Sequence, residues 1–347
     1  MDLLAFFMKK IEASFGVVLP TYAGDATSTP GAEEYWGLYD LTLNDDVSWS
    51  RIIQVAKDSE QLGYTSLWAP DHFMLGKNGM TFEAWSTLSA VSQITSRVTL
   101  GTWVSCNGYR NPALTAKMAT SLSLMSAGRF ILGYGAGWYG HEYEAYGYDF
   151  PRPKQRVEML EEGVKVIRGM MENDKFNFTG HYYRVKDAVN NPKPPKPTPL
   201  MIGGWSKKIV SLAARYADQW DIGAEPTYEE YGAKIEFLKE QLRLNGKRFD
   251  EFTCSVGVHV LIAENETQLT EKKKRVIRVI DALGQKIVQL PSLDYKFDME
   301  KVVVGTPVQV RERLARYVEL GCQRFELMFM DYPKYNSLEL FASTVMG

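Results

Sequence analysis

The hydrophobic positions of this chain follow two patterns that alternate along its whole length. Short and nearly continuous apolar runs, typical of parallel strands buried on both faces, alternate with longer segments of helical period. The predicted strands are Ser14–Leu19, Thr65–Ala69, Val98–Cys106, Arg129–Tyr134, Leu200–Gly203, Gln219–Gly223, Cys254–Ile262 and Gln323–Met330. The predicted helices are Trp49–Gly63, Glu83–Thr95, Asn111–Ser126, Gln155–Glu172, Lys207–Ala217, Tyr228–Leu244, Glu266–Leu283 and Val308–Leu320.

Glycine and proline mark the ends of these elements. Gly63, Gly128 and Gly321 each stand at the end of a predicted helix, shortly before a strand. Asn111-Pro112 and Thr306-Pro307 each place a capping side chain before a proline of the first helical turn. Eight strands alternating with eight helices are what a closed barrel needs. We therefore predict an α/β fold, a TIM (β/α)8 barrel, with an open doubly wound sheet as the alternative.

Two insertions interrupt the spacing of what we expect to be a single domain over residues 1–347. Thr21–Asp46 leaves the C-terminal end of the first strand, is rich in acidic residues and is predicted to be a lid on the active-site face. Residues 139–199 are expected to hold a helix, a hairpin and a proline-rich connector. The hairpin is predicted over Phe176–Ala188, with its turn at Thr179-Gly180, and the connector over Asn191–Pro199.

Composition and charge narrow the function classes. The 347 residues are 45% hydrophobic and 24% charged, with a net charge of −2. A nucleic-acid surface normally has a clear basic excess, so none is expected, and the basic run at residues 272–275 is predicted to be a solvated helix face. No apolar stretch approaches the roughly 18 residues of a membrane span. The three cysteines form no C-x-x-C pair, so no metal site is predicted and the expected location is a reducing cytoplasm.

The clearest local motif is Leu200–Ser206, where a predicted strand turns through Gly203 and Gly204 into a helix at Lys207. Backbone N–H groups and the positive end of the helix dipole meet at such a turn. A phosphate group fits there, with the Ser206 hydroxyl as a further donor. The alternative is a tight turn in which Ser206 only caps the helix.

A second glycine-rich segment, Gly133–Trp138, closes the fourth predicted strand, and Gly135 to Gly140 reads G-x-G-x-x-G. We reject a dinucleotide-binding interpretation because residues 141–153 show no helical period. Glycines at a strand end are instead expected to let a flat ring or a substrate approach the backbone closely.

Polar residues end the second and third predicted strands. His72 titrates near neutrality and is the candidate for proton transfer, with Asp71 beside it as a partner that orients it or caps the turn. The alternative is a structural histidine bonded to a loop carbonyl. Thr102, Ser105 and Asn107 are expected to hydrogen-bond the polar edge of a heteroaromatic ring.

Further motifs run in order along nearly the whole chain. They are Pro70–Phe73, Tyr109–Ala113, Leu124–Phe130, Gly133–Trp138, Glu142-Tyr143, Arg156-Val157, Phe178–Tyr183, Ile202–Ser206, Ala213–Trp220 and Val304–Pro307. Together they resemble the bacterial-luciferase-like family of oxidoreductases. The resemblance implies a β/α barrel that binds reduced FMN or the deazaflavin coenzyme. The sequence around His72 is more similar to the deazaflavin-dependent branch.

The resemblance also implies roles for individual residues. The coenzyme phosphate would be held by Gly203, Gly204, Trp205 and Ser206. Further coenzyme contacts would be Glu142 and Arg156, with Gly133 and Gly135 at the border of the ring and the Thr102–Cys106 bulge behind it. His72 would act near the reacting ring atom. Thr21–Asp46 has no counterpart in the family pattern.

Several functions stay open at this level. The favoured one is hydride transfer between a deazaflavin coenzyme and a small organic substrate, with His72 as acid or base. The alternatives are a monooxygenase that receives reduced FMN from a separate flavin reductase, and a non-catalytic flavin-binding barrel. An unrelated aldolase or isomerase would need a strand-end lysine or carboxylate pair, for which Glu326 is the nearest candidate. The resemblance further implies a homodimer.

Overall fold

The computed structural model describes residues 11–22, 47–75, 79–224, 226–274, 302–331 and 337–347. Within them, eight parallel strands pair side by side and close on themselves, since β12 pairs with β1. In order around the barrel they are β1 (Ser14–Val18), β2 (Ser66–Ala69), β3 (Thr99–Thr102), β5 (Phe130–Gly135), β8 (Leu200–Gly203), β9 (Gln219–Ala224), β10 (Thr253–Ile262) and β12 (Arg324–Phe329). The predicted TIM barrel is confirmed, and a short strand, β11 (Val303–Gly305), extends the sheet beside β10.

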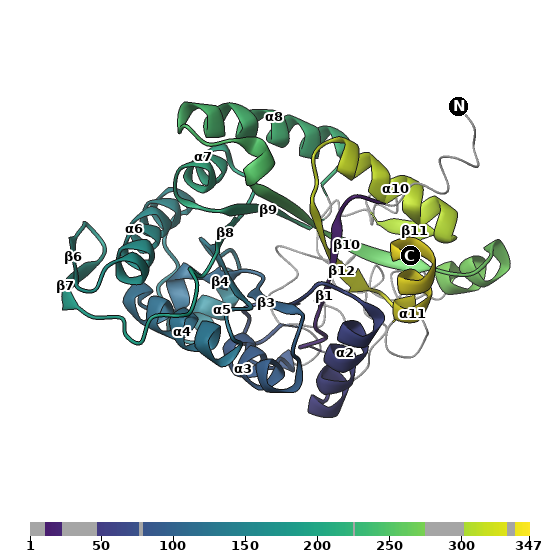
Figure 1. Cartoon of the computed structure of the whole chain (residues 1–347), viewed down its shortest axis with the longest axis horizontal. Helices are drawn as coiled ribbons and strands as arrows, with labels where there is room; N and C mark the ends of the chain where they lie inside the picture. The colour runs from purple at the N-terminus through teal and green to yellow at the C-terminus, as the bar shows by residue number, and fades with distance from the viewer. Residues whose placement is uncertain (1–10, 23–46, 76–78, 225, 275–301, 332–336) are drawn as a thin grey trace.

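Helices surround this barrel (Figure 1). They are α2 (Trp49–Leu62), α3 (Ala84–Ile94), α4 (Pro112–Met125), α6 (Pro153–Glu172), α7 (Lys207–Tyr216), α8 (Tyr228–Leu244), α10 (Pro307–Glu319) and α11 (Ser337–Phe341). Residues 266–274 are also helical, and the rest of the helix predicted to Leu283 lies outside the described residues. The predicted caps are present: Gly63 ends α2 in the left-handed region, and Asn111 accepts a hydrogen bond from the first turn of α4.

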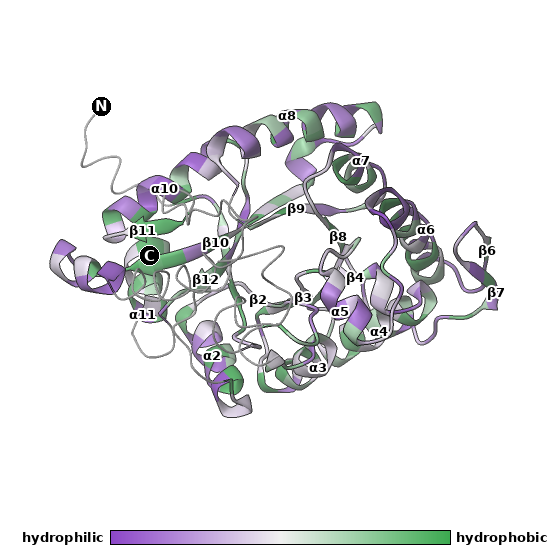
Figure 2. Ribbon diagram, turned by 180° about the vertical axis from the view of Figure 1, so that it is seen from behind, coloured by the Kyte–Doolittle hydropathy of each residue, from purple (hydrophilic) through white to green (hydrophobic). Residues whose placement is uncertain are grey.

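The main core lies between the barrel strands and the inner faces of the helices. Buried side chains such as Leu132, Val164 and Ile235 fill this layer. The ribbons of α8 and α10 alternate between hydrophilic and hydrophobic residues along their length, as helices with one buried face do (Figure 2). The space inside the barrel is different, because apolar Trp68 and Met201 share it with Arg324 and Glu326.

The described parts of the two insertions lie at the C-terminal face and at one end of the molecule. Residues 23–46 of the predicted lid lie outside the described residues. The second segment contains the short helix α5 (Gly140–Ala145), the helix α6, and the predicted hairpin, formed by β6 (Phe176–Thr179) and β7 (Arg184–Ala188). The hairpin projects from one end of the molecule (Figure 1), and α6 packs between α4 and α7 as a barrel helix.

Three expectations need correction. The predicted strand Val98–Cys106 is two strands, β3 and β4 (Ser105–Cys106), separated by Trp103 and Val104, which a cis peptide bond joins. Residues 141–153 are not without helix, because α5 begins at Gly140. The basic run at 272–275 is not simply a solvated face, since the Lys272 ammonium bonds the Ile262 carbonyl (2.7 Å) and the buried Asp331 carboxylate.

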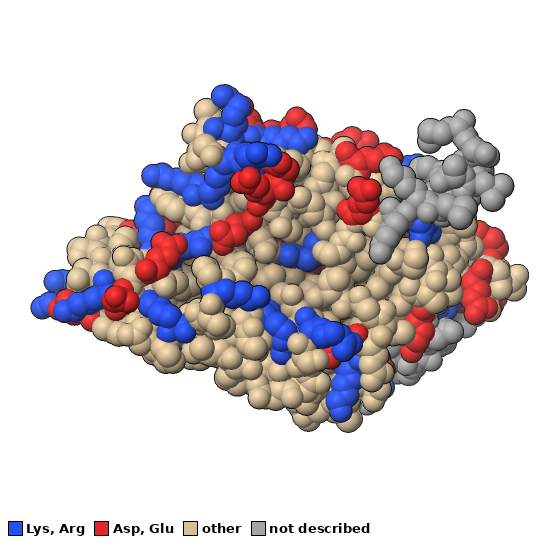
Figure 3. Space-filling view, in the orientation of Figure 1, with Lys and Arg blue, Asp and Glu red and all other residues tan. Residues whose placement is uncertain are grey.

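Surface charge shows no single-sign field on the face seen in Figure 3, where basic and acidic groups are interspersed among uncharged ones. Among the residues that the structure describes, no helix has the length and apolar content needed to cross a membrane.

Candidate functional site

A cavity of about 490 Å³ opens at the C-terminal ends of the barrel strands. Several residues predicted for the site line it: Asp71, His72, Gly135, Arg156, Gly203, Gly204, Trp205 and Ser206. The other predicted residues are not part of its wall: Thr102, Ser105, Asn107, Gly133 and Glu142. Glu326 does not line the cavity either, which removes the basis for an aldolase-type interpretation at this position.

The turn after β8 leads directly into α7, as predicted, and contains the helix cap that was the alternative role of Ser206. Ser206 caps α7, because its hydroxyl accepts a hydrogen bond from the Ile209 N–H at 3.3 Å. Gly204 has a φ of 131°, a conformation that favours glycine, and its carbonyl accepts a hydrogen bond from the Trp220 indole at 2.8 Å. The first N–H groups of a helix have no partner within it, so this turn offers donors to an anion in the cavity.

His72, at the end of β2, is held by a carboxylate that the chain brings from 70 residues away. Its Nδ1 lies 2.9 Å from Oε2 of Glu142, which sits on α5. The Glu142 side chain is fully buried and accepts three further hydrogen bonds, from the Phe73 N–H (2.5 Å), the Met74 N–H (2.8 Å) and the Tyr109 hydroxyl (2.5 Å). With Nδ1 engaged, Nε2 is the His72 nitrogen left to serve the cavity.

Contact between His72 and Glu142 shifts the pKa values of both side chains toward their charged forms. Burial by itself lowers the pKa of His72, but the Glu142 carboxylate outweighs it and raises that pKa above its ordinary value of 6.5. Burial by itself raises the pKa of Glu142, but His72 and the other donors bring it below its ordinary value of 4.5. The pair therefore favours an ionised carboxylate beside a basic imidazole.

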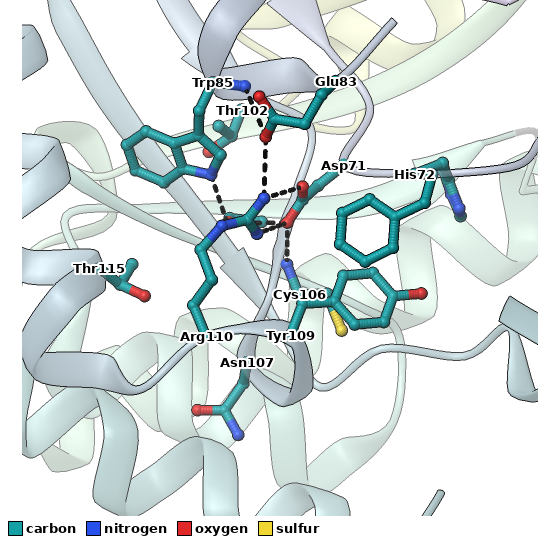
Figure 4. A network of polar contacts seen from close by, with 12 residues as sticks. Asp71, His72, Glu83, Trp85, Thr102, Cys106, Asn107, Tyr109, Arg110 and Thr115 are labelled. Atoms are coloured by element: carbon teal, nitrogen blue, oxygen red, sulfur yellow. Dashed lines mark hydrogen bonds and ion pairs between the residues drawn. The ribbon is translucent and has the colours of Figure 1, made fainter. Parts of the chain in front are cut away.

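Asp71 was expected to orient His72 or to cap the turn, and its hydrogen bonds go to other groups. Its buried carboxylate receives both terminal nitrogens of Arg110, at 2.6 and 3.0 Å, together with the Ser105 hydroxyl and the Cys106 N–H. Arg110 also bonds Glu83 at 2.8 Å, so it joins three segments of the chain (Figure 4). These hydrogen bonds of Asp71 hold the β4 segment in place.

The polar strand-end residues expected to contact a ring are hydrogen-bonded within the protein instead. Thr102 donates to the Gly133 carbonyl at 2.7 Å, and Ser105 donates to Asp71. Asn107 accepts from the Tyr134 hydroxyl (2.6 Å) and donates to the Tyr183 hydroxyl (2.9 Å), which ties the hairpin to the barrel. The bulge between β3 and β4 turns these side chains away from the cavity and brings Trp103 and Val104 to it.

The glycines at the strand ends make room for this bulge. A Cβ atom on Gly135 would lie 2.7 Å from a Val104 methyl, and one on Gly203 would lie 2.8 Å from the other. A Cβ on Gly133 would meet the Thr102 carbonyl oxygen at 2.0 Å. The glycines therefore admit Val104, which in turn forms the wall that faces the cavity.

Among the lining residues that sequence reasoning did not single out are two with ionisable side chains, Asp221 and His259. Asp221 lies within β9, and its Oδ1 accepts from the Trp103 indole N–H at 3.0 Å. His259 is buried on β10, although His72 was expected to be the histidine that matters. The available signal was an acid within the run Gln219–Gly223 and a histidine within the run Cys254–Ile262, both otherwise largely apolar.

Cys106 lines the cavity but has no nucleophilic character. Its sulfur lies 2.8 Å from the Tyr143 hydroxyl, and burial raises the pKa of its thiol to about 12. A thiol with that pKa stays protonated near neutrality, in agreement with a packing role.

Comparison of the sequence with known proteins identifies the family of this chain. The sequence pattern of the luciferase-like monooxygenase family matches residues 13–324. An F420-dependent glucose-6-phosphate dehydrogenase from Intrasporangium calvum is 34% identical over 306 residues, 83% of this chain and 91% of that protein. An enzyme of the same name from Amycolatopsis mediterranei is 34% identical over 187 residues, 53% of this chain and 56% of that protein, so the match spans little more than half of this relative. The chain belongs to the luciferase-like monooxygenase family.

A solved structure supports the fold. An F420-dependent secondary alcohol dehydrogenase, in complex with an F420–acetone adduct, superposes with a TM-score of 0.76 at 20% identity, covering 96% of this chain and 98% of the other. At that identity the likeness establishes the shared barrel.

Proposed function

We propose that this chain is an oxidoreductase that transfers hydride between a deazaflavin coenzyme and an alcohol or carbonyl substrate. The observation that carries the proposal is the fixed His72–Glu142 pair, whose imidazole lines the same cavity as the phosphate turn at Gly203–Ser206. The names of the relatives, which are F420-dependent dehydrogenases, support the choice of coenzyme and of reaction class.

The described residues fit such a coenzyme. The start of α7 offers backbone donors for a phosphate, and Gly204 and Ser206 shape the turn. Trp103 and Val104 form an apolar surface against which a flat ring can rest, and Arg156 adds a cation to the wall. When bound, the deazaflavin ring supplies the hydride chemistry, which no side chain can provide.

The chain's own residues manage the proton. During oxidation of an alcohol, His72 takes the hydroxyl proton on Nε2, and in the reverse direction it returns the proton to the carbonyl oxygen. Glu142 holds Nδ1, fixes the orientation of the ring and stabilises the imidazolium that forms. Asp71 and Arg110 are assigned positioning roles, since they hold the segment that carries the bulge.

A monooxygenase that receives reduced FMN from a separate reductase is the second candidate. The family description and the phosphate turn are compatible with it. The His72–Glu142 pair favours the dehydrogenase, because oxidation of an alcohol needs a fixed proton acceptor beside the reacting carbon. The homodimer and the cytoplasmic location stay predictions.

The test is reduction of oxidised deazaflavin coenzyme by a panel of alcohols that includes secondary alcohols and glucose 6-phosphate, followed by the coenzyme's absorbance. We expect turnover with at least one alcohol and, in H72Q, a loss of kcat on the order of 100-fold with coenzyme affinity nearly unchanged. H181Q, at an exposed histidine of the hairpin, is the matched control and should retain full activity. Full activity of H72Q would refute the assignment of His72.

A further inference from the structure

Beneath the cavity, the interior of the barrel holds two carboxyl groups and one guanidinium. Glu326 and Arg324 project inward from β12, and Asp221 comes from β9; all three are buried. The Arg324 Nε donates to Oε1 of Glu326 at 2.7 Å. Its other nitrogens meet neutral groups, the Gln219 amide oxygen at 2.7 Å and the Met201 sulfur at 3.0 Å. One positive charge is thus available for two acids.

The two acids differ in the donors that surround them. Asp221 accepts three hydrogen bonds, from the Trp103 indole at 3.0 Å, the Gly223 N–H at 2.8 Å and the Ser255 hydroxyl at 2.7 Å. Glu326 Oε2 is fully buried and receives no hydrogen bond from any donor of the described residues. Another ionisable neighbour of Glu326, besides Arg324, is the Asp221 carboxyl group, whose negative charge adds to the effect of burial in raising the pKa of Glu326.

A hydrogen bond between two carboxyl groups requires a proton, because ionised carboxylate oxygens only accept. Two negative charges in this dry space with one arginine would also repel each other strongly. The three donors around Asp221 stabilise its ionised form, whereas the second oxygen of Glu326 has none. The proton therefore belongs on Glu326.

We propose that Glu326 is a neutral carboxylic acid that donates its proton in a hydrogen bond to Asp221, and that Asp221, held in this way, positions the Trp103 indole as the floor of the cavity. The space for that indole is provided by Gly257, where a Cβ would lie 2.3 Å from Trp103 Cζ2. Asp221 and Glu326 are thus positioning residues. The proposal concerns the protein alone and does not depend on which coenzyme the cavity binds.

The ionisable groups around Glu326 support this assignment. They are Arg324 on its own strand, Asp221 on β9 and the Cys322 thiol just before β12, while β2 contributes the uncharged Trp68, whose ring lies 4.5 Å from the Arg324 guanidinium. Burial raises the pKa of Glu326 well above its ordinary value of 4.5, Arg324 opposes the rise and the Asp221 charge adds to it.

The sign of the pH dependence follows. An acid whose pKa is higher in the folded state binds more protons folded than unfolded, so it costs stability progressively as pH rises from the unfolded pKa to the folded one. Glutamine copies the neutral acid, since its amide can donate to Asp221 and accept from Arg324. E326Q should escape the cost.

The experiment is thermal unfolding of coenzyme-free wild type and E326Q across pH. We expect equal Tm values near the ordinary glutamate pKa of 4.5 and a Tm advantage for E326Q that grows with pH, reaching about 3 °C or more near neutrality. A difference that stays flat or falls with pH overturns the proposal, because an ionised Glu326 would leave Arg324 poorly compensated after the substitution.

Two further measurements test the protonation of Glu326 and the positioning role of Asp221 separately. Infrared difference spectra of wild type should show the carbonyl band of a protonated carboxylic acid. The band should be missing in E326Q and retained in E142Q, because Glu142 is ionised in wild type and gives no such band. Absence of the band in wild type contradicts the proposal.

The unfolding free energies of W103F, D221N and the double variant test whether Asp221 acts through Trp103. If it does, the two single losses should not add in the double variant, and additivity would refute the positioning role. No coenzyme is needed, so a failure here is distinct from a failure of the proposed function.

Discussion

Glu142 and Glu326 are both fully buried glutamates of the same barrel, yet their surroundings favour an ionised carboxylate at Glu142 and a neutral acid at Glu326. Glu142 lies on α5 behind His72, outside the cavity wall, and accepts four hydrogen bonds, so its pKa is lowered. Burial inside the barrel raises the pKa of Glu326, the charge of Asp221 adds to the rise, and a single arginine donor does not offset it. Burial does not decide the charge of a carboxyl group; the number and kind of donors do.

The difference extends to what each group does. The ionised Glu142 strengthens a base that serves the cavity from its side. The neutral Glu326 holds the floor through Asp221 and Trp103 without contributing a charge. The predictions below alter one side of this comparison at a time.

Removing the charge of Glu142 should have the largest effect. In E142Q the buried donors around this position lose their carboxylate, and we expect the unfolding free energy to fall by about 3 kcal/mol, as judged by denaturant titration. E144Q, on the same short helix but exposed, is the control and should stay close to wild type. A loss no greater than that of E144Q would mean that Glu142 is not ionised.

The loss of stability in E142Q should also depend on pH, whereas E326Q should gain stability relative to wild type as pH rises. The raised pKa of His72 contributes stability that is complete below about 6.5 and is lost as pH rises through the folded pKa. The lowered pKa of Glu142 contributes stability that is present above about 4.5 and is lost as pH falls through the folded pKa. The deficit of E142Q should therefore be greatest in a window around pH 5 to 6 and shrink on both sides. A deficit that is constant with pH would contradict the ion pair.

A substitution at Arg110 tests a third buried carboxylate, Asp71. Like Glu142, Asp71 accepts several hydrogen bonds, one of them from a backbone N–H. Lysine cannot bond Asp71 in a bidentate manner while also reaching Glu83, so R110K should lower the unfolding free energy by about 2 kcal/mol. R248K changes an exposed ion pair with Asp250 and should leave the unfolding free energy close to that of wild type. Equal effects of the two changes would show that burial adds nothing to the Asp71 contacts.

Much of the fold could be predicted because its signals are local. The buried strands appear as apolar runs, and residues such as Gly63 and Pro112 mark the helix ends directly in the sequence. The phosphate turn was equally visible, since two glycines, a serine and a helix start are consecutive. These features need no information about distant residues.

The interior of the site depends on distant contacts and was less accessible. Glu142 was expected to touch the coenzyme, but its carboxylate is used by His72, 70 residues earlier in the chain. The orientations of Thr102 and Ser105 depend on a bulge, which reverses the inward and outward alternation that a regular strand would have. Periodicity cannot locate such a reversal.

The bulge itself provides the next test. G135A should push the Val104 methyl that would lie 2.7 Å from the new Cβ, and we expect a loss of about 1–2 kcal/mol in unfolding free energy. The double variant V104A/G135A should be more stable than the sum of the two single losses predicts, because alanine at 104 removes the clash. Additive losses would show that Gly135 does not serve to admit Val104.

The smallest effect is expected at the phosphate turn. S206A removes a helix cap and one donor at the cavity, so stability should fall by about 1 kcal/mol, with coenzyme affinity several-fold weaker. Ser48, which caps α2 and does not line the cavity, provides the control: S48A should cost a similar amount of stability and leave affinity unchanged. Similar coenzyme affinities of S206A and S48A would show that the Ser206 hydroxyl does not contribute to coenzyme binding.

The most direct test of the proposed site is a titration of the wild-type protein with deazaflavin coenzyme and with FMN, followed by tryptophan fluorescence. Trp103, Trp138 and Trp205 line the cavity and should report occupancy by either ring. We predict saturable quenching by the deazaflavin coenzyme with a Kd of about 1 μM or lower, equivalent to about −8 kcal/mol, and weaker binding of FMN. Absence of binding by both would contradict the assignment of the cavity as a coenzyme site, and tighter binding of FMN would favour the monooxygenase.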